Sequence, residues 1–320
     1  MWIIIMIIIL YTHTKGLIVM DIKSCKIKDV DIIFLSYDEP NAEENWADLQ
    51  RKIPWAKRVH GVEGSDAAHK ACADLSETKH FVTVDGDTIV DPKFMHVELD
   101  YEKLNVDDDY QFSWCGKVNA NGLMYGNGSL KMWTKDFVSN MKTHENTDGA
   151  DDTQIEFCYF DNYYQLNENY SESIITSTPA QAWRAGFREG VKMSLNRGTP
   201  VKNLKEIWWQ NYHRLLVWMS VGADVKNGLY SVMGAREGCY KTMCTDWDHV
   251  VTRDFTWLNK YWDTIKDVNV NDRIIELGTE LQNQLNLPIS KLALDEKQSE
   301  FFKTVYINSD RVIRKNERTR

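Results

Sequence analysis

Hydrophobic and polar positions alternate along residues 31–90 in repeated blocks. Short apolar runs rich in β-branched residues occupy 32–36, 56–62 and 80–84, and amphipathic segments fill 43–52 and 65–75. Runs of this length favour buried strands, whereas apolar residues at helical spacing favour helices. Strand and helix units joined by short connections form a mostly parallel sheet with right-handed crossovers. The pattern therefore predicts an α/β fold, a Rossmann-like sheet flanked by helices.

The second half of the chain changes from strand and turn signals to helical ones. Residues 111–133 combine aromatic residues with glycines, which predicts a hairpin, and 181–193 and 255–262 have helical spacing. We expect residues 21–265 to form the main domain and residues 266–320 a helical extension that ends in a basic tail.

The first twenty residues differ from the rest because Trp2 to Leu10 is an unbroken apolar run. A membrane-spanning helix needs about 20 apolar residues, and a signal peptide needs a basic segment before its apolar core. Neither is present, so we treat residues 1–20 as an appendage outside the fold and expect no membrane association. Anchoring by this run remains the alternative to a translation start near Met20.

Composition narrows the class of protein. With 38 Lys and Arg against 47 Asp and Glu, the net charge is −9, so the chain as a whole does not attract nucleic acid, and any polyanion must meet a local basic patch. None of the six cysteines forms a CxxC pair or lies in a cluster with zinc-site spacing. We expect free thiols in a reducing compartment, hence a cytoplasmic protein.

The sequence Asp85-Gly86-Asp87 directly follows the third predicted strand. In a parallel sheet, ligands bind at the carboxyl ends of the strands. Carboxylates two positions apart can face one side of an extended segment, and two such oxygen ligands suit Mg²⁺ or Mn²⁺ that also holds phosphates. The motif predicts a metal-bound diphosphate site, and a solvated turn is the alternative.

At this level of detail the sequence resembles the GT-A glycosyltransferases, and more narrowly the TET-associated glycosyltransferases of tailed phages. The motifs that carry the likeness are residues 32–41, Glu44-Asn45-Trp46, residues 54–59, residues 81–87 and residues 181–193. The resemblance implies a sugar transfer from a nucleotide-diphosphate sugar, in that family onto a hydroxymethylated pyrimidine of DNA, and a location in the host cytoplasm if the gene is viral.

The resemblance also implies roles for single residues. Asp87 would bind the metal ion, and Asp85 would hold the donor ribose or share the ion. The loop after the first strand would grip the base and ribose of the donor through Ser36, Asp38 and Glu39. A helix-entry cap is the alternative for this loop. Further residues would lie around the donor sugar and the metal ion.

Of these, Asn127 would contact the donor sugar from a glycine-rich turn, for which a plain hairpin is the alternative. GT-A enzymes often add a late histidine to the metal shell, and His249 or His213 could serve, although a structural histidine explains either residue.

A carboxylate must accept the proton of the acceptor hydroxyl if the transfer inverts the sugar carbon. Asp151 and Asp152 are our candidates for this base. Acidic residues at a helix start also stabilise the helix dipole without any catalytic role.

Arg184, Arg188 and Lys192 are spaced by four residues and would share one helical face. Arginine binds phosphate bidentately, so this face could hold the donor diphosphate or a phosphate of the acceptor. A solvated basic face is the alternative.

Together these features predict a metal-dependent glycosyltransferase whose acceptor is modified DNA. The alternatives are a glycosyltransferase acting on polysaccharide, lipid or protein, and a non-catalytic protein that binds nucleotide sugars on the same scaffold.

Overall fold

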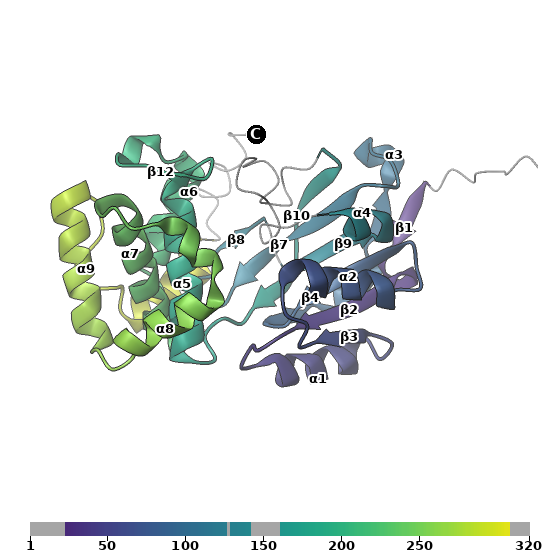
Figure 1. Cartoon of the computed structure of the whole chain (residues 1–320), viewed down its shortest axis with the longest axis horizontal. Helices are drawn as coiled ribbons and strands as arrows, with labels where there is room; N and C mark the ends of the chain where they lie inside the picture. The colour runs from purple at the N-terminus through teal and green to yellow at the C-terminus, as the bar shows by residue number, and fades with distance from the viewer. Residues whose placement is uncertain (1–22, 127–128, 142–160, 308–320) are drawn as a thin grey trace, which may run out of the picture.

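The computed structural model describes residues 23–126, 129–141 and 161–307. Within these residues a twisted sheet with its covering helices forms one side of the molecule, and a group of helices forms the other (Figure 1). The elements of the sheet side are β1 (Ser24–Lys26), β2 (Asp31–Ser36), α1 (Ala42–Lys52), β3 (Lys57–His60), α2 (Ser65–Leu75), β4 (His80–Asp85), β5 (Thr88–Val90), β6 (Glu98–Asp100), α3 (Tyr101–Leu104), β7 (Gln111–Val118), β8 (Met124–Tyr125), β9 (Leu130–Thr134), α4 (Lys135–Asn140) and β10 (Tyr163–Ser173).

Eight strands of the described residues form the central sheet in the order β3-β2-β4-β9-β7-β10-β5, with β8 paired to β7. The strands β2, β3 and β4 pair in parallel, as do β7 and β10, and the antiparallel strand β9 joins the two groups. Five strands therefore run in one direction, and the expected α/β fold with a mostly parallel, Rossmann-like sheet is confirmed.

The two faces of the sheet are covered by different helices because side chains alternate along each strand. Ile32 and Phe34 of β2 pack with Leu49 of α1 in one buried cluster. Their neighbour Ile33 packs on the opposite face with Cys72 of α2 and with residues of α4. The near-continuous apolar run of β2 thus reflects burial on both faces.

The helical side begins at α5, directly after the last long strand. Its elements are α5 (Pro179–Met193), β11 (Leu195–Asn196), β12 (Thr199–Pro200), α6 (Trp209–Trp218), α7 (Gly228–Cys244), the 3₁₀ helix η6 (His249–Arg253), α8 (Phe255–Ile265), α9 (Val270–Leu285) and α10 (Glu296–Phe301). The helices α5, α7, α8 and α9 enclose a core of their own. The boundary expected at 265/266 falls in the turn between α8 and α9.

Two buried charged side chains of α7 tie this side together. Arg236 donates hydrogen bonds to five backbone carbonyls, including Met219 O at 2.9 Å and Ile274 O at 2.8 Å. Glu237 accepts from Trp183 Nε1 at 3.0 Å and forms an ion pair with Arg273 at 2.8 Å. Since each buried charge is fully hydrogen-bonded, its desolvation is offset. The helical side is therefore held in one defined arrangement.

The expected N-terminal appendage, residues 1–20, and the basic tail from 308 onwards lie outside the described residues. In the part of the chain that the structure does describe, no helix combines the length and the apolar character required to cross a membrane.

Candidate functional site

The Asp85-Gly86-Asp87 sequence forms the tight connection between β4 and β5. A Cβ atom at Gly86 would lie 2.6 Å from Oε2 of Glu39 and 2.9 Å from Cβ of Ser36, so the loop after β2 packs directly on this glycine. The side chain of Asn45 donates to the Gly86 carbonyl at 3.0 Å. Only glycine fits between the two aspartates in this arrangement.

Both aspartates line one cleft of about 440 Å³. Its sheet side consists of the carboxyl ends of β4, β7 and β10, where Ser129 Oγ and Ser173 Oγ form a hydrogen bond of 2.8 Å. Its opposite wall consists of α5, the end of α6 and η6. A cleft of this size can hold a small polar ligand, and its position at the carboxyl ends of parallel strands is where α/β folds bind ligands.

Negative charge is concentrated at the floor of the cleft. Burial, together with the charges of Asp85 and Glu39, raises the pKa of Asp87 to about 7. Asp85 is more exposed, and its carboxylate lies 3.8 Å from the ammonium of Lys131. The carboxylate of Asp87 is therefore destabilised in the absence of a cation, and a positive ion at this point would relieve that repulsion.

The two aspartate carboxylates at the floor of the cleft fit one mode of binding Mg²⁺ or Mn²⁺. No three His, Cys, Asp or Glu side chains of the described residues gather closely enough to enclose an ion. Mg²⁺ is commonly bound by one or two carboxylates, with water and substrate phosphates as the other ligands. Asp85 and Asp87 match this mode, in which the substrate completes the site.

The opposite wall carries positive charge. Arg188, Lys192 and Arg253 line it, and His249 lies beside them. The Nε2 atom of His249 is 3.0 Å from the carbonyl oxygen of Gly198, so this ring nitrogen already has a partner. The cleft thus has an acidic floor and a basic wall, which suits a ligand that combines phosphates with a divalent cation.

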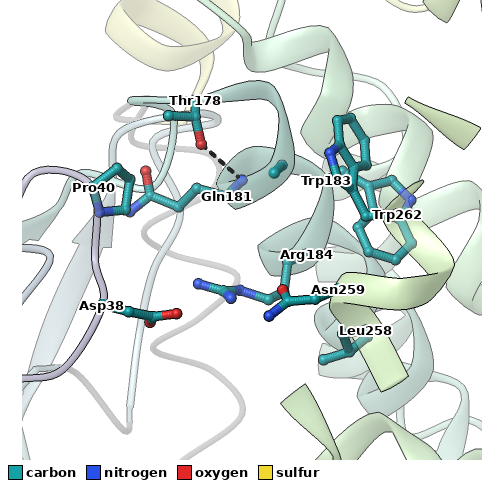
Figure 2. Close-up of a pocket in the computed structure, with 10 residues that line it drawn as sticks. Asp38, Pro40, Thr178, Gln181, Trp183, Arg184, Leu258, Asn259 and Trp262 are labelled. Atoms are coloured by element: carbon teal, nitrogen blue, oxygen red, sulfur yellow. Dashed lines mark hydrogen bonds between the residues drawn. The ribbon is translucent and has the colours of Figure 1, made fainter. Parts of the chain in front are cut away.

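A second, smaller pocket of about 210 Å³ lies along α5, the helix that also lines the cleft (Figure 2). Asp38 from the loop after β2 and Arg184 from α5 extend toward each other across it. The guanidinium groups of Arg184 and Arg188 both lie over the ring of Phe255, at 5.0 and 5.1 Å. Phe255 therefore packs against one cation of each pocket, and α5 supplies cations to both.

The other expected donor residues lie nearby in less open positions. Ser36 is buried, and its hydroxyl is 3.0 Å from Nδ1 of His60. The carboxylate of Glu39 accepts the Tyr37 backbone N–H at 2.8 Å. Both therefore shape the loop around Gly86. Asn127, Asp151 and Asp152 lie outside the described residues.

Three residues of the cleft were not expected from the sequence. Glu189 and Tyr125 lie on opposite sides of it, and the Tyr125 hydroxyl donates to Glu189 Oε2 at 2.6 Å. Trp218 Nε1 donates to the same hydroxyl at 3.2 Å. Since 64 residues separate Tyr125 from Glu189, only the folded chain brings them together.

Comparison with known proteins gives a likeness at the level of structure only. No protein-family model matches the chain, and no curated protein sequence matches it. Among solved structures, a glycosyltransferase involved in the glycosylation of the major capsid of PBCV-1 is similar at 14% identity, with a TM-score of 0.29, over 46% of this chain and 95% of that one. The likeness is confined to less than half of the present chain.

Two further structures are similar to the same extent. HddC from Yersinia pseudotuberculosis matches at 16% identity, with a TM-score of 0.26, over 45% of this chain and 72% of its own. The inositol-1-phosphate CTP transferase from T. maritima matches at 11% identity, with a TM-score of 0.28, over 47% and 71%. Likenesses at this level do not establish an activity, so the function has to be argued from the site itself.

Proposed function

We propose that this protein is a glycosyltransferase that uses a nucleotide-diphosphate sugar and a divalent cation, Mn²⁺ or Mg²⁺. The observation that carries the proposal is the pair Asp85 and Asp87, which share one cleft at the carboxyl ends of the parallel strands. The resemblance of residues 32–41 and 81–87 to GT-A enzymes supports the same activity.

In this proposal Asp85 and Asp87 hold the cation, which when bound neutralises the charge that builds up on the departing diphosphate. Arg188 and Lys192 of α5 face the same space and stabilise the diphosphate from the opposite wall. His249 of η6 would add a ligand to the cation through its ring nitrogen Nδ1, because Nε2 already contacts the carbonyl oxygen of Gly198.

The nucleoside part of the donor would occupy the small pocket beside the cleft. Asp38 offers a carboxylate to ribose hydroxyls, and Arg184 offers hydrogen-bond donors to the base or to a phosphate. Ser36 and Glu39 support this pocket indirectly, because they pack against Gly86 and fix the loop that carries Asp38. Asn127 remains a predicted contact of the sugar.

During transfer the oxygen of the acceptor hydroxyl attacks the anomeric carbon, and the bond from that carbon to the diphosphate oxygen breaks. The diphosphate leaves with the electron pair. A carboxylate takes the proton of the hydroxyl in an inverting reaction. Asp151 and Asp152 remain the predicted candidates for this base.

We further propose that the acceptor is a hydroxymethylated pyrimidine of DNA. The resemblance to the TET-associated glycosyltransferases supports this acceptor, and so does Arg253, a cation of the cleft wall to which the donor scheme gives no role. A base must leave the double helix to reach such a site, which costs a few kcal/mol unless the DNA is single-stranded.

The test combines donors, metal and acceptors. The protein is incubated with Mn²⁺ and a panel of sugar nucleotides, with hydroxymethylcytosine DNA or unmodified DNA as acceptor, and the DNA is analysed by mass spectrometry. We expect a mass increase of one sugar on the modified DNA only. Release of nucleoside diphosphate without any change in the DNA would point to a polysaccharide, lipid or protein acceptor. No release with any donor would contradict the enzyme and leave a binding protein.

A further inference from the structure

Glu189 differs from the other charged groups of the cleft in its surroundings. It lies on α5 between the basic wall and the end of β8, and it is half-buried. Cationic residues of the same helix line the same cleft, and the charge of Glu189 also interacts with that of Arg214. Its carboxylate accepts a hydrogen bond from the hydroxyl of Tyr125. The direct contact of the Glu189 carboxylate is therefore with a neutral hydroxyl donor.

A chain of donors holds this carboxylate in a fixed orientation. Trp218 Nε1 donates to the Tyr125 hydroxyl, which in turn donates to Glu189 Oε2. The guanidinium of Arg214 lies 4.7 Å from the centre of the Tyr125 ring and holds the ring from one side. Burial and the charge of Glu189 raise the pKa of Tyr125, so the phenol keeps the proton that it donates. Each group in the chain thus supports the next one toward the cleft.

The chain of donors engages Glu189 through Oε2, and the second carboxylate oxygen, Oε1, can accept a further hydrogen bond. A phosphate would be repelled at this point, because it would place two negative groups side by side. A neutral group that donates a hydrogen bond is favoured instead, and hydroxyl groups are the donors that a sugar presents. Gly116 lines the cleft beside Tyr125 and brings no side chain into it.

We propose that Glu189, oriented by Tyr125, binds a hydroxyl group of the transferred sugar and so determines which sugar the enzyme accepts. This inference rests on the proposed function. In this arrangement the donor lies across the cleft with its diphosphate between Asp87 and the basic wall, and its uncharged sugar reaches Glu189.

Binding calorimetry with Mn²⁺ tests this assignment directly. The probes are UDP-glucose, UDP-galactose, UDP-N-acetylglucosamine and GDP-mannose, each compared with its own nucleoside diphosphate. For the preferred sugar nucleotide, we expect Glu189→Gln to weaken binding about 10- to 100-fold, while binding of the bare nucleoside diphosphate stays unchanged, because only the sugar loses a charged hydrogen-bond acceptor. Tyr125→Phe should give a smaller loss in the same direction and relax the choice between glucose and galactose.

Two controls separate this effect from damage to the fold. Glu300→Gln changes an exposed glutamate of α10 and should bind all probes as the unaltered protein does. The thermal unfolding midpoint of Glu189→Gln should match that of Glu300→Gln.

The remaining outcomes overturn the assignment. Unchanged binding of the sugar nucleotides by Glu189→Gln would overturn it. If this variant instead raised only the KM of the acceptor in the transfer assay, the assignment would also fail, because an acceptor hydroxyl would then occupy this position. If the unaltered protein binds nucleoside diphosphates but no sugar nucleotide more tightly, the inference fails while nucleotide binding stands. If it binds none of the probes, the proposed function itself fails.

Discussion

At the scale of single residues, the chemistry of the cleft depends on carboxylates in different surroundings. Asp87 lies close to Asp85 and Glu39, and its pKa is raised to about 7. Glu189 is held by a single hydroxyl donor on the opposite wall. A carboxylate crowded by other carboxylates favours a cation, whereas one that already lies beside cationic residues can accept from a neutral donor. In our proposal, neighbours rather than residue type therefore give these acids different tasks.

Asp87→Asn should abolish catalysis and at the same time stabilise the metal-free protein. The amide removes a charge that the fold disfavours, so we expect the thermal unfolding midpoint in the presence of chelator at pH 8 to rise by about 2–4 °C. Release of nucleoside diphosphate with Mn²⁺ should fall by about 100-fold or more.

The control for this substitution is Asp74→Asn, which changes an exposed aspartate of α2 and should leave both the midpoint and the activity unchanged. A lower midpoint for Asp87→Asn would show instead that Asp87 is a structural residue.

Two buried histidines predict how the stability depends on pH. Burial lowers the pKa of both His69 and His80 below the ordinary value of 6.5. Above pH 6.5 both rings are neutral in the folded and unfolded chains. Below it the unfolded chain takes up protons that the folded chain does not, so stability decreases as the pH falls, by up to about 1.4 kcal/mol per pH unit for each ring.

Urea unfolding at pH 7.5, 6.5 and 5.5 measures this dependence. The double variant His69→Gln, His80→Gln should lose less stability between pH 6.5 and 5.5 than the unaltered protein does. His96→Gln, at an exposed position, should keep the original slope. If stability changed equally with pH in all three proteins, His69 and His80 would be ruled out as the source of the pH dependence.

At the scale of elements, the strands and helices were largely predictable, whereas the contacts between them were not. The strand at 32–36 follows from its run of apolar, β-branched residues, which is buried on both faces of the sheet, and β2 covers Asp31–Ser36. The basic face of 181–193 was predicted because its cations recur every four residues, and α5 carries it. Glu189 was missed because its partner Tyr125 comes from a distant strand, and periodicity carries no information on such pairs.

The packing of α5 on α7 depends on glycines of both helices. A Cβ atom at Gly190 would lie 2.2 Å from the carbonyl oxygen of Ala235, and one at Gly238 would lie 2.2 Å from that of Phe187. The backbones of the two helices therefore touch, and any side chain at these positions would force them apart. Because α5 also carries Arg188 and Glu189, this contact helps to position a helix that lines the cleft.

Gly190→Ala should therefore lower the free energy of unfolding more than the substitution of a glycine that only adopts an unusual backbone angle. We expect a loss of about 3 kcal/mol in the free energy of unfolding, since the clash is with backbone atoms that cannot rotate away. Gly61→Ala is the matched control: its Cβ would meet no atom within 4 Å, but its φ of 73° costs about 1–2 kcal/mol. Urea unfolding of both variants checks the order, and equal losses would contradict the tight contact.

At the scale of the whole molecule, the distribution of charge matters more than its sum. The chain carries a net charge of −9, yet Arg184, Arg188 and Lys192 follow each other along α5, and Arg253 lies on the same wall of the cleft. Composition predicted that a polyanion would need a local basic patch, and spacing predicted the row on α5. Arg253 lies beside this row because the chain turns and brings η6 next to α5. No local sequence pattern reveals this contact.

This distribution makes a quantitative prediction for a DNA acceptor. Because the rest of the molecule is acidic, phosphate contacts should be confined to the basic wall, so few counterions are released on binding. The KM for hydroxymethylcytosine oligonucleotides should rise with salt, and affinity should fall with a log–log slope of about −2 to −4, as expected for a few phosphate contacts. Arg253→Gln should reduce the slope by about one, because it removes one contact.

A hydroxymethylated mononucleoside is the matched acceptor without a phosphate backbone. Its KM should be nearly independent of salt in the unaltered protein and in Arg253→Gln, because no counterion is displaced when a neutral acceptor binds. A steep slope that persists in Arg253→Gln would place the phosphate contacts on another surface. Equal and shallow slopes for oligonucleotide and nucleoside would mean that the basic wall serves the donor diphosphate alone, and the acceptor would then have to be sought among neutral hydroxyl compounds.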